Sequence, residues 1–102
     1  SNAFIVTKNK KIITCKISEN VLAGVTRFSI LETAKFLGFE VEVRPFSVKE
    51  AELAKEAFIT SATNFIASVV EINGISIGRG KVGSMTKLLR DQYLIDIKKS
   101  AV

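Results

Sequence analysis

The chain has 102 residues, of which 47% are hydrophobic and 25% charged; this fits one small globular domain and leaves no room for two. The formal net charge is +5, but the lysines are dispersed along the chain, which favours solvated surfaces over a nucleic-acid interface. Because the sequence has no histidine, it excludes Ser-His and Cys-His nucleophile pairs and the usual zinc-ligand sets, and we expect no metal site.

The first predicted elements are two strands that form a β-hairpin. Residues 4–7 and 12–15 are apolar and β-branched, and the polar residues 8–11 between them suit a turn. Cys15 ends the second strand, where it is expected to fill core space rather than to act as a nucleophile. One cysteine allows no internal disulfide, which suits a cytoplasmic location. No apolar run reaches membrane-spanning length, so we expect no membrane partner.

An apolar turn over residues 20–27 leads into the first predicted helix. Thr26 is predicted to be its N-cap, because the hydroxyl can accept a hydrogen bond from a backbone N–H group one turn on. The free N–H groups and the positive dipole end of such a helix suit a phosphate, although most capped helices bind nothing. The helix is expected to run to Leu37 and stop at Gly38, with an apolar face made of Phe28, Leu31, Ala34 and Leu37.

The middle of the chain predicts a strand, a short helix and a second strand. Residues 40–44 alternate charged and apolar side chains, which indicates a half-buried strand. Residues 47–50, Ser-Val-Lys-Glu, fit a capping box that opens a short helix to about Ala54. Residues 57–60 are apolar enough to predict a buried strand.

A second hairpin is predicted after this strand. A small polar turn, residues 61–64, precedes an apolar and β-branched strand over residues 65–72. The dipeptide Asn73-Gly74 then favours a tight turn into a short return strand, residues 75–77.

A glycine-rich loop, residues 78–83, precedes the final helix. Its likeness to a phosphate-binding P-loop is superficial, because Lys81 is followed by Val82 and the G-x-x-x-x-G-K-[ST] spacing is not met. The helix is predicted to begin near Ser84, with one side made of Met85, Leu88, Leu89, Tyr93 and Ile97. Strands and helices interleave without a repeat or linker, so the expected fold class is α/β and residues 1–102 form a single domain.

Two polar segments are candidates for an anion site. One is the helix start at Gly24-Val25-Thr26, and the other is the hydroxyl-rich run of residues 60–63 at the end of a predicted buried strand. Each of them, taken singly, is better explained as an ordinary cap or turn. Together they raise the case for an anion without naming a ligand.

Several motifs occur in a fixed order along the chain. They are Gly24-Val25-Thr26-Arg27, Glu32, Val41-Glu42-Val43-Arg44-Pro45-Phe46, Glu56-Ala57-Phe58-Ile59-Thr60-Ser61-Ala62-Thr63, Val69-Val70-Glu71-Ile72-Asn73-Gly74-Ile75-Ser76-Ile77-Gly78 and Gly80-Lys81-Val82-Gly83. This succession resembles the C-terminal part of the fold-type IV pyridoxal-phosphate enzymes, which include D-amino acid aminotransferase, branched-chain aminotransferase and aminodeoxychorismate lyase. The resemblance covers nearly the whole chain. It implies a part of the family's larger domain, with a mixed sheet, hairpins and about three helices.

The resemblance implies pyridoxal 5'-phosphate as the cofactor and gives roles to residues at the helix start. Leu22 matches the leucine that packs on one face of the pyridine ring. Gly24, Val25 and Thr26 match the segment that holds the phosphate through backbone N–H groups and the threonine hydroxyl. Arg27 is expected to anchor this turn rather than to touch the ligand.

The resemblance also gives roles to the polar bend that follows the buried strand. Ser61 and Ala62 match a second turn on the phosphate side, and the N–H groups of Ala62 and Thr63 match the place where the family receives the substrate carboxylate or completes the phosphate site. Many members have threonine where this chain has Ala62, so one phosphate contact is expected to be missing or to move to a neighbouring hydroxyl. Phe65 stands where branched-chain enzymes usually have glutamate, which favours the D-amino acid branch.

The catalytic parts of the family are expected outside this chain. The family's Schiff-base lysine, the carboxylate that pairs with the pyridine nitrogen and the arginine on the phosphate all match positions before the first residue. The resemblance therefore implies a segment with no catalytic residue of its own, inactive alone, whose partner is the N-terminal part of a parent chain. The parent is expected to be a homodimer acting on an amino acid and a 2-oxo acid.

Three functions stay open at this point. The first is the cofactor-phosphate segment of a pyridoxal-phosphate-dependent aminotransferase, with D-amino acid (D-alanine) transamination preferred. The second is branched-chain aminotransferase or aminodeoxychorismate lyase activity on the same scaffold. The third is a non-catalytic domain that binds an anion or a partner chain.

Overall fold

A five-stranded mixed sheet forms the centre of the molecule, in the strand order β3-β2-β1-β4-β5. The computed structural model describes residues 2–15, 21–60, 66–72, 74–78 and 80–100, with the backbone alone for 21–26 and 97–100. A separate hairpin pairs β6 with β7. The elements are β1 (Asn2–Val6), β2 (Lys11–Thr14), α1 (Val21–Phe36), β3 (Glu40–Val43), α2 (Val48–Leu53), β4 (Glu56–Thr60), β5 (Ile66–Val69), β6 (Glu71–Ile72), β7 (Ile75–Ser76) and α3 (Ser84–Ser100).

Three of the four strand pairs in this sheet are antiparallel. β1 pairs with β2 as the predicted hairpin, and on its other side β1 pairs with β4, so that Asn2 lies opposite Thr60. β4 continues into an antiparallel pair with β5. β2 and β3 are parallel, and α1 is the crossover between them. The α/β class with a mixed sheet, hairpins and three helices is confirmed.

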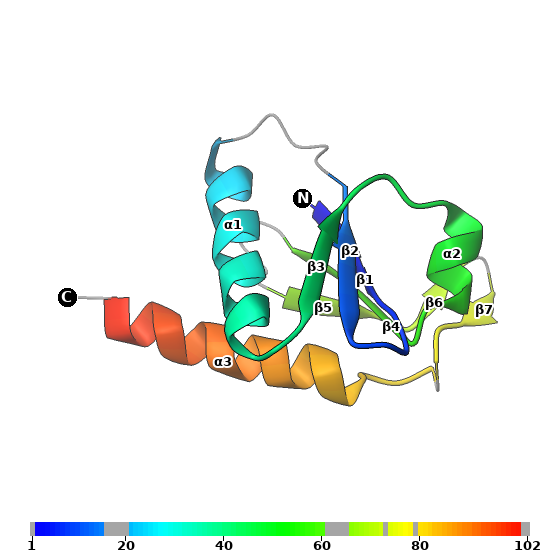
Figure 1. Ribbon diagram of the computed structural model, residues 1–102. Coiled ribbons are helices and arrows are strands. Elements are labelled where there is room, and N and C mark those ends of the chain that lie inside the picture. Colours follow the sequence, from blue (N-terminus) through cyan, green and yellow to red (C-terminus); the bar gives the residue numbers. More distant parts are fainter. Residues whose placement is uncertain (1, 16–20, 61–65, 73, 79, 101–102) are drawn as a thin grey trace.

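Helices α1 and α3 cover one face of the sheet, whereas α2 and the β6–β7 hairpin lie on the other side (Figure 1). On the first face, the rings of Phe4 and Phe58 stack on neighbouring strands with centroids 4.7 Å apart. Ile30 of α1 and Leu89 and Tyr93 of α3 pack in the same buried cluster. The second cluster, on the opposite face, contains Ile5, Ile13, Ala51, Ala54, Ala57 and Ile77.

Helix α1 spans the sheet from one end to the other. Because β2 and β3 are parallel, the chain must return to the opposite end of the sheet before β3 begins. Lys10 marks that opposite end, since its Nζ donates to the Leu37 carbonyl oxygen at 3.2 Å and its own carbonyl oxygen accepts the Glu40 N–H at 3.2 Å. α1 therefore begins near the other end of the sheet, where β2 and β4 end (Figure 1). We call this the Thr60 end of the sheet.

The side of α1 that packs on the sheet differs from the predicted one. Phe28 is predicted in the apolar face but is 65% exposed, whereas Ile30 is fully buried. Ala34 is buried and Leu31 and Leu37 are partly buried, as predicted. The residues that face the sheet are those spaced four apart from Ile30, and Phe28 lies on the opposite side of the helix. The 3.6-residue periodicity predicts that the helix has an apolar face. It does not decide which of two overlapping sets of apolar residues packs on the sheet.

Two further boundaries differ from the sequence prediction. The single strand expected over residues 65–72 is divided into β5 and β6, which belong to different sheets, with Val70 between them. Phe65 and Asn73 lie outside the described residues.

In α3, Leu89 and Tyr93 are buried as predicted, but Leu88 is 47% exposed. The side chain of Ile97 is outside the described part of the chain. Cys15 is half-buried just beyond β2.

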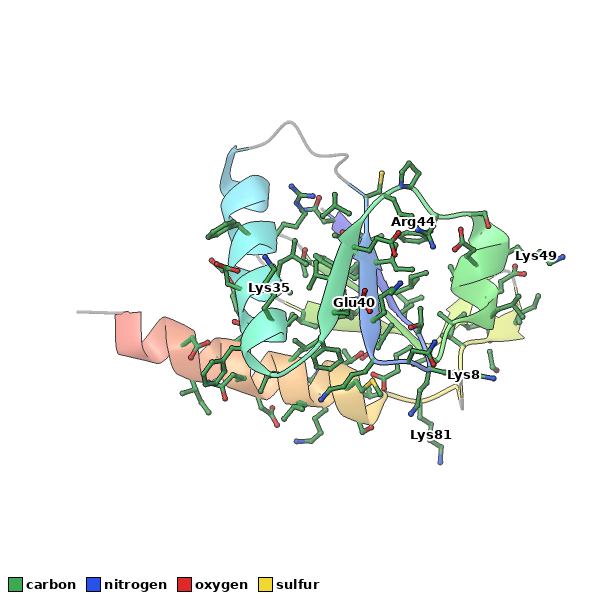
Figure 2. All side chains as sticks on the ribbon, in the orientation of Figure 1. Lys8, Lys35, Glu40, Arg44, Lys49 and Lys81 are labelled. Carbon is green, nitrogen blue, oxygen red and sulfur yellow. The ribbon has the colours of Figure 1, made fainter. Side chains whose placement is uncertain are left out.

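A charged cluster joins the end of β3 to α2. Figure 2 shows Arg44 between the two elements, where its Nη2 lies 2.9 Å from Glu50 Oε2 and its Nε lies 3.1 Å from Glu42 Oε1. The predicted capping box is confirmed, because the Glu50 N–H donates to the Ser47 hydroxyl oxygen and the Glu50 carboxylate accepts the Ser47 N–H. The hydrogen bond from Arg44, together with that from the Ser47 backbone, lowers the pKa of Glu50. A hydrogen bond from Lys11 is the main cause of a lowered pKa at Glu42.

The lowered pKa values make the contribution of Arg44 to stability depend on pH. A carboxylate whose pKa is lower in the folded state stabilises the fold above the ordinary glutamate pKa of 4.5, and this contribution is lost as the pH falls through the folded value. Arg44→Met is therefore expected to lower the melting temperature near neutral pH, with the difference from wild type shrinking below about pH 4.5. Thermal melts of both proteins across that range measure this effect. Lys49→Met is the control, because Figure 2 shows Lys49 pointing away from the molecule; a difference for Arg44→Met that is independent of pH would contradict the prediction.

Candidate functional site

The residues predicted to bind the cofactor belong to two segments of the chain. Leu22, Gly24, Val25 and Thr26 lie in the first two turns of α1, where the structure describes the backbone. Ser61, Ala62 and Thr63 follow β4 and lie outside the described residues. The roles of all seven residues stay predictions.

The prediction that Thr26 caps α1 is wrong. The helix begins at Val21, five residues earlier, so Thr26 lies in its second turn. In a helix that begins there, the N–H groups of Val25 and Thr26 donate to carbonyl oxygens four residues back, and the free N–H groups belong to the turn before them. Leucine and alanine are strong helix formers, so this segment extends the helix even though Gly24 costs about 1 kcal/mol relative to alanine.

The start of α1 and the end of β4 lie at the same end of the sheet. α1 begins near the Thr60 end, and Thr60 itself is the last residue of β4, immediately before Ser61 and Ala62 in the sequence. α1 also contacts β4 directly. The topology therefore brings the start of α1 and the last residue of β4 to one end of one sheet, although they are separated by more than thirty residues of sequence.

The N-terminal turn of α1 has an electrostatic character that suits an anion. Its first turn carries no acidic residue, so no carboxylate from that turn offsets the positive end of the helix dipole. Arg27 lies one turn further along the helix, three residues before the buried Ile30, which places it on the side that faces the sheet. The helix dipole and the guanidinium of Arg27 each contribute positive charge near the start of α1.

Arg27 and Thr60 each carry a buried polar atom that has no hydrogen-bond partner among the described residues. These atoms are Nη1 of Arg27 and the hydroxyl oxygen of Thr60, whose residue is 1% exposed. Arg27 is predicted to anchor the turn, but it makes no hydrogen bond or ion pair with any described residue. The sequence analysis named Thr60 only as part of the hydroxyl-rich run of residues 60–63. The feature that could have identified it is a hydroxyl side chain at the last position of a predicted buried strand.

A cleft of about 460 Å³ lies away from these groups, between the β1–β2 turn and α2. Its lining includes Ile5, Lys8, Lys11 and Arg44, and two of these cations are already paired with glutamates. It opens on the sheet face that α2 covers, opposite to α1.

Among the described residues, no three histidine, cysteine, aspartate or glutamate side chains gather in a way that could hold a metal ion. The helices described here also include none with the length and apolar character needed to cross a membrane.

Residues 1–72 match the model of the amino-transferase class IV family. The chain belongs to this family. It is 40% identical over 93 residues to an Aquifex aeolicus protein named "Probable branched-chain-amino-acid aminotransferase", covering 90% of this chain and 30% of that protein. It is also 31% identical over 86 residues to the branched-chain-amino-acid aminotransferase of Escherichia coli strain K12, covering 84% of this chain and 28% of that protein.

Solved structures of class IV aminotransferases share the fold. A branched-chain amino acid aminotransferase with pyridoxamine 5'-phosphate, from the organism abbreviated T.th., superposes with a TM-score of 0.82 at 33% identity, over 91% of this chain and 30% of that one. The branched-chain amino acid aminotransferase of Thermobaculum terrenum, in its PLP form, superposes with a TM-score of 0.81 at 35% identity, over 92% of this chain and 31% of that one. The predicted fold-type IV resemblance is confirmed. The chain spans about a third of the length of these class IV aminotransferases.

Proposed function

We propose that this chain forms one wall of the cofactor site of a pyridoxal-phosphate-dependent aminotransferase. The observation that carries the proposal is the match of residues 1–72 to the class IV aminotransferase family, together with the common fold of relatives solved with pyridoxamine phosphate or in a PLP form. The chain corresponds to about a third of such an enzyme, so its amino acid and 2-oxo acid substrates are bound jointly with the rest of the protein.

The residues at the Thr60 end of the sheet fit a phosphorylated cofactor. The helix dipole of α1, the unpaired guanidinium nitrogen of Arg27 and the unpaired Thr60 hydroxyl all suit a group with negative oxygen atoms. In the proposed site, Leu22 packs against the ring, and the phosphate is held by a segment of α1 and by the bend after β4. The proposed residues are Gly24, Val25, Thr26, Ser61 and Ala62, and Thr26 contributes its hydroxyl, because the N–H groups of Val25 and Thr26 donate within α1.

The cofactor, when bound, supplies the chemistry that moves an amino group between an amino acid and a 2-oxo acid. The residues of this chain bind and orient; they do not transfer the proton. Residues that hold the phosphate rigidly would fix the cofactor ring relative to the catalytic lysine. Such positioning raises the rate of the reaction. The N–H groups of Ala62 and Thr63 are proposed to receive the substrate carboxylate. Because the chain has no residue at the position of the family's lysine, we expect the 102-residue chain alone to be inactive as a transaminase.

Branched-chain amino acids are the substrate class that the relatives favour. The relatives and solved structures above are named as branched-chain enzymes. The run Ser61-Ala62-Thr63-Asn64-Phe65 favours the D-amino acid branch instead, and this remains the second candidate. We also propose, from the family, a cytoplasmic homodimer as the working assembly.

Substrate assays on the whole aminotransferase that contains this chain test the proposal. With 2-oxoglutarate as amino acceptor, leucine, isoleucine and valine are compared with D-alanine by kcat/KM. Faster turnover of the branched substrates supports the first candidate, whereas a preference for D-alanine supports the second. Absence of transamination with either set, in protein that absorbs as a pyridoxal-phosphate complex, would contradict an aminotransferase function.

Thr26→Val in the same whole protein is expected to weaken cofactor retention while leaving the fold intact. Valine has a similar shape but lacks the hydroxyl that is proposed to hold the phosphate, and loss of a hydrogen bond to a charged group costs about 1.5–3 kcal/mol. This corresponds to roughly a 10- to 150-fold weaker affinity. Cofactor absorbance after dialysis measures retention, and circular dichroism checks the fold. Thr7→Val, in the turn at the opposite end of the sheet, is the control; unchanged affinity in Thr26→Val would remove that residue from the site.

A further inference from the structure

Arg27 stands out among the basic residues whose side chains the structure describes, because its guanidinium is partly buried and has no partner among the described residues. Its Nη1 atom is enclosed by protein without a hydrogen-bond acceptor, and the residue forms no ion pair in the described part of the molecule. By contrast, Arg44 is paired with two glutamates. A buried guanidinium nitrogen without an acceptor is costly, because it has lost water and gained nothing in return. Such a group calls for an acceptor that the described part of the chain does not supply.

The position of Arg27 limits where that acceptor can be. The residue lies on the side of α1 that faces the sheet, one turn before Ile30 toward the helix N-terminus. Side chains on a helix lean toward its N-terminus, so the guanidinium extends toward the Thr60 end of the sheet. Thr60 is 1% exposed there, and its hydroxyl oxygen is another buried atom that has no hydrogen-bond partner among the described residues. The two unsatisfied groups belong to elements that contact each other, α1 and β4.

We propose that Arg27 is an oxyanion-binding residue of this chain, and that the group it pairs with is the cofactor phosphate. The inference rests on the function proposed above and changes the expected role of Arg27 from a structural anchor to a ligand contact. A phosphate at the Thr60 end receives charge-assisted hydrogen bonds from the guanidinium, lies at the positive end of α1, and can accept from the Thr60 hydroxyl. Arg27 therefore supplies positive charge from within this segment, in addition to any arginine that the rest of the enzyme contributes.

This assignment predicts opposite effects of Arg27 on the free and the phosphate-bound chain. Without an anion, Arg27→Met removes an uncompensated charge and keeps an apolar stem of similar length, so the melting temperature is expected to stay equal to or above that of wild type. With millimolar inorganic phosphate, the melting temperature of wild type is expected to rise, because a ligand that binds the folded state stabilises it. Arg27→Met is expected to lose this rise.

The experiment compares thermal melts of the cofactor-free form of the whole aminotransferase that contains this chain, as wild type and as Arg27→Met, in inorganic phosphate, pyridoxal phosphate, pyridoxal and 4-methylvalerate, each matched in ionic strength with sodium chloride. Arg90→Met is the control, since Arg90 is a partly exposed arginine that belongs to another helix, α3, and lies thirty residues after Thr60 in the sequence. A rise with both phosphates that Arg27→Met abolishes and Arg90→Met keeps supports the proposal. A rise with 4-methylvalerate alone assigns the site to a carboxylate and overturns it.

Further outcomes separate this inference from the proposed function. If Thr26→Val abolishes the phosphate-dependent rise but Arg27→Met keeps it, the cofactor site stands and the role of Arg27 is overturned. If Arg27→Met lowers the melting temperature without phosphate, Arg27 is a structural anchor and the inference is again overturned. If wild type responds to neither phosphate compound, both the inference and the assignment of a phosphate site to this chain are overturned.

Discussion

Phe58→Ala is expected to remove most of the stability of the chain. Phe58 is fully buried in β4, and its ring stacks on Phe4 of the neighbouring strand with an angle of 11° between the planes. Truncating a buried phenylalanine costs about 3–5 kcal/mol, because the lost contacts leave a cavity that the surrounding side chains fill incompletely. Small domains have about 5–15 kcal/mol in total, so the variant is expected to be partly unfolded at about 37 °C. Urea denaturation followed by circular dichroism measures the loss.

The neighbouring residue provides the control for Phe58. Ile59 is in the same strand, but its side chain points to the opposite face and is 43% exposed. Ile59→Ala is expected to cost less than about 1.5 kcal/mol, since much of the side chain already contacts water. If Phe58→Ala fails to fold, Phe58→Leu, which retains most of the apolar volume, provides a measurable intermediate. Equal costs at the two positions would contradict the described packing of β4.

Glu56→Ala is expected to destabilise the chain by roughly 3 kcal/mol through the loss of a helix cap. Glu56 is 5% exposed, and its two carboxylate oxygens accept the N–H groups of Met85 at 3.0 Å and Thr86 at 2.6 Å. These are free N–H groups of the first turn of α3, and a carboxylate there is also stabilised by the helix dipole. Removal of the carboxylate leaves both N–H groups without this acceptor, and the hydrogen bond of Thr86 is a buried one. Chemical denaturation gives the free energy of unfolding.

Gly83 gives a second and independent test of the same contact. A Cβ atom at this position would overlap the side chain of Glu56, so Gly83→Ala is expected to displace the carboxylate and destabilise the chain by about 1–3 kcal/mol. The combined variant Glu56→Ala/Gly83→Ala is expected to cost less than the sum of the two single changes, because the clash disappears with the side chain. Glu71→Ala, at an exposed glutamate of β6, is the control. Strict additivity would show that the two residues do not interact.

The sequence predicts those parts of the fold that depend on local patterns. The β1–β2 hairpin, the capping box of α2 and the β6–β7 hairpin are each specified by residues within a few positions of one another, and all three are confirmed. The succession of short motifs is also enough to identify the class IV aminotransferase family. Local rules succeed here because cap and turn energies are decided by neighbouring residues.

The features that the sequence does not predict depend on contacts between distant segments. The cap of α3 comes from Glu56, about thirty residues away, while the residue before Ser84 is a glycine without a side chain. Likewise, the periodicity of α1 does not choose Ile30 over Phe28 as the residue that faces the sheet. The sequence prediction places the start of α1 too late, at Thr26 instead of Val21. The apolar residues from Val21 onward contain no capping residue, so their pattern does not distinguish an apolar turn from the first turn of a helix. Of the candidate site, the topology shows that α1 begins near the end of the sheet where β4 ends, and the roles of the site residues stay predictions.

The pairing of β1 with β4 has a consequence for the order in which the chain folds. Asn2–Val6 lies in the middle of the sheet, yet one of its two neighbours is Glu56–Thr60, which leaves the ribosome only after about fifty further residues have been made. At the usual rate of about 5–20 residues per second, the first strand waits several seconds with one side unpaired. Long-range pairing of this kind slows folding and exposes strand edges while it is incomplete. Protein synthesis therefore passes through a stage in which the nascent hairpin is open to pairing with other chains.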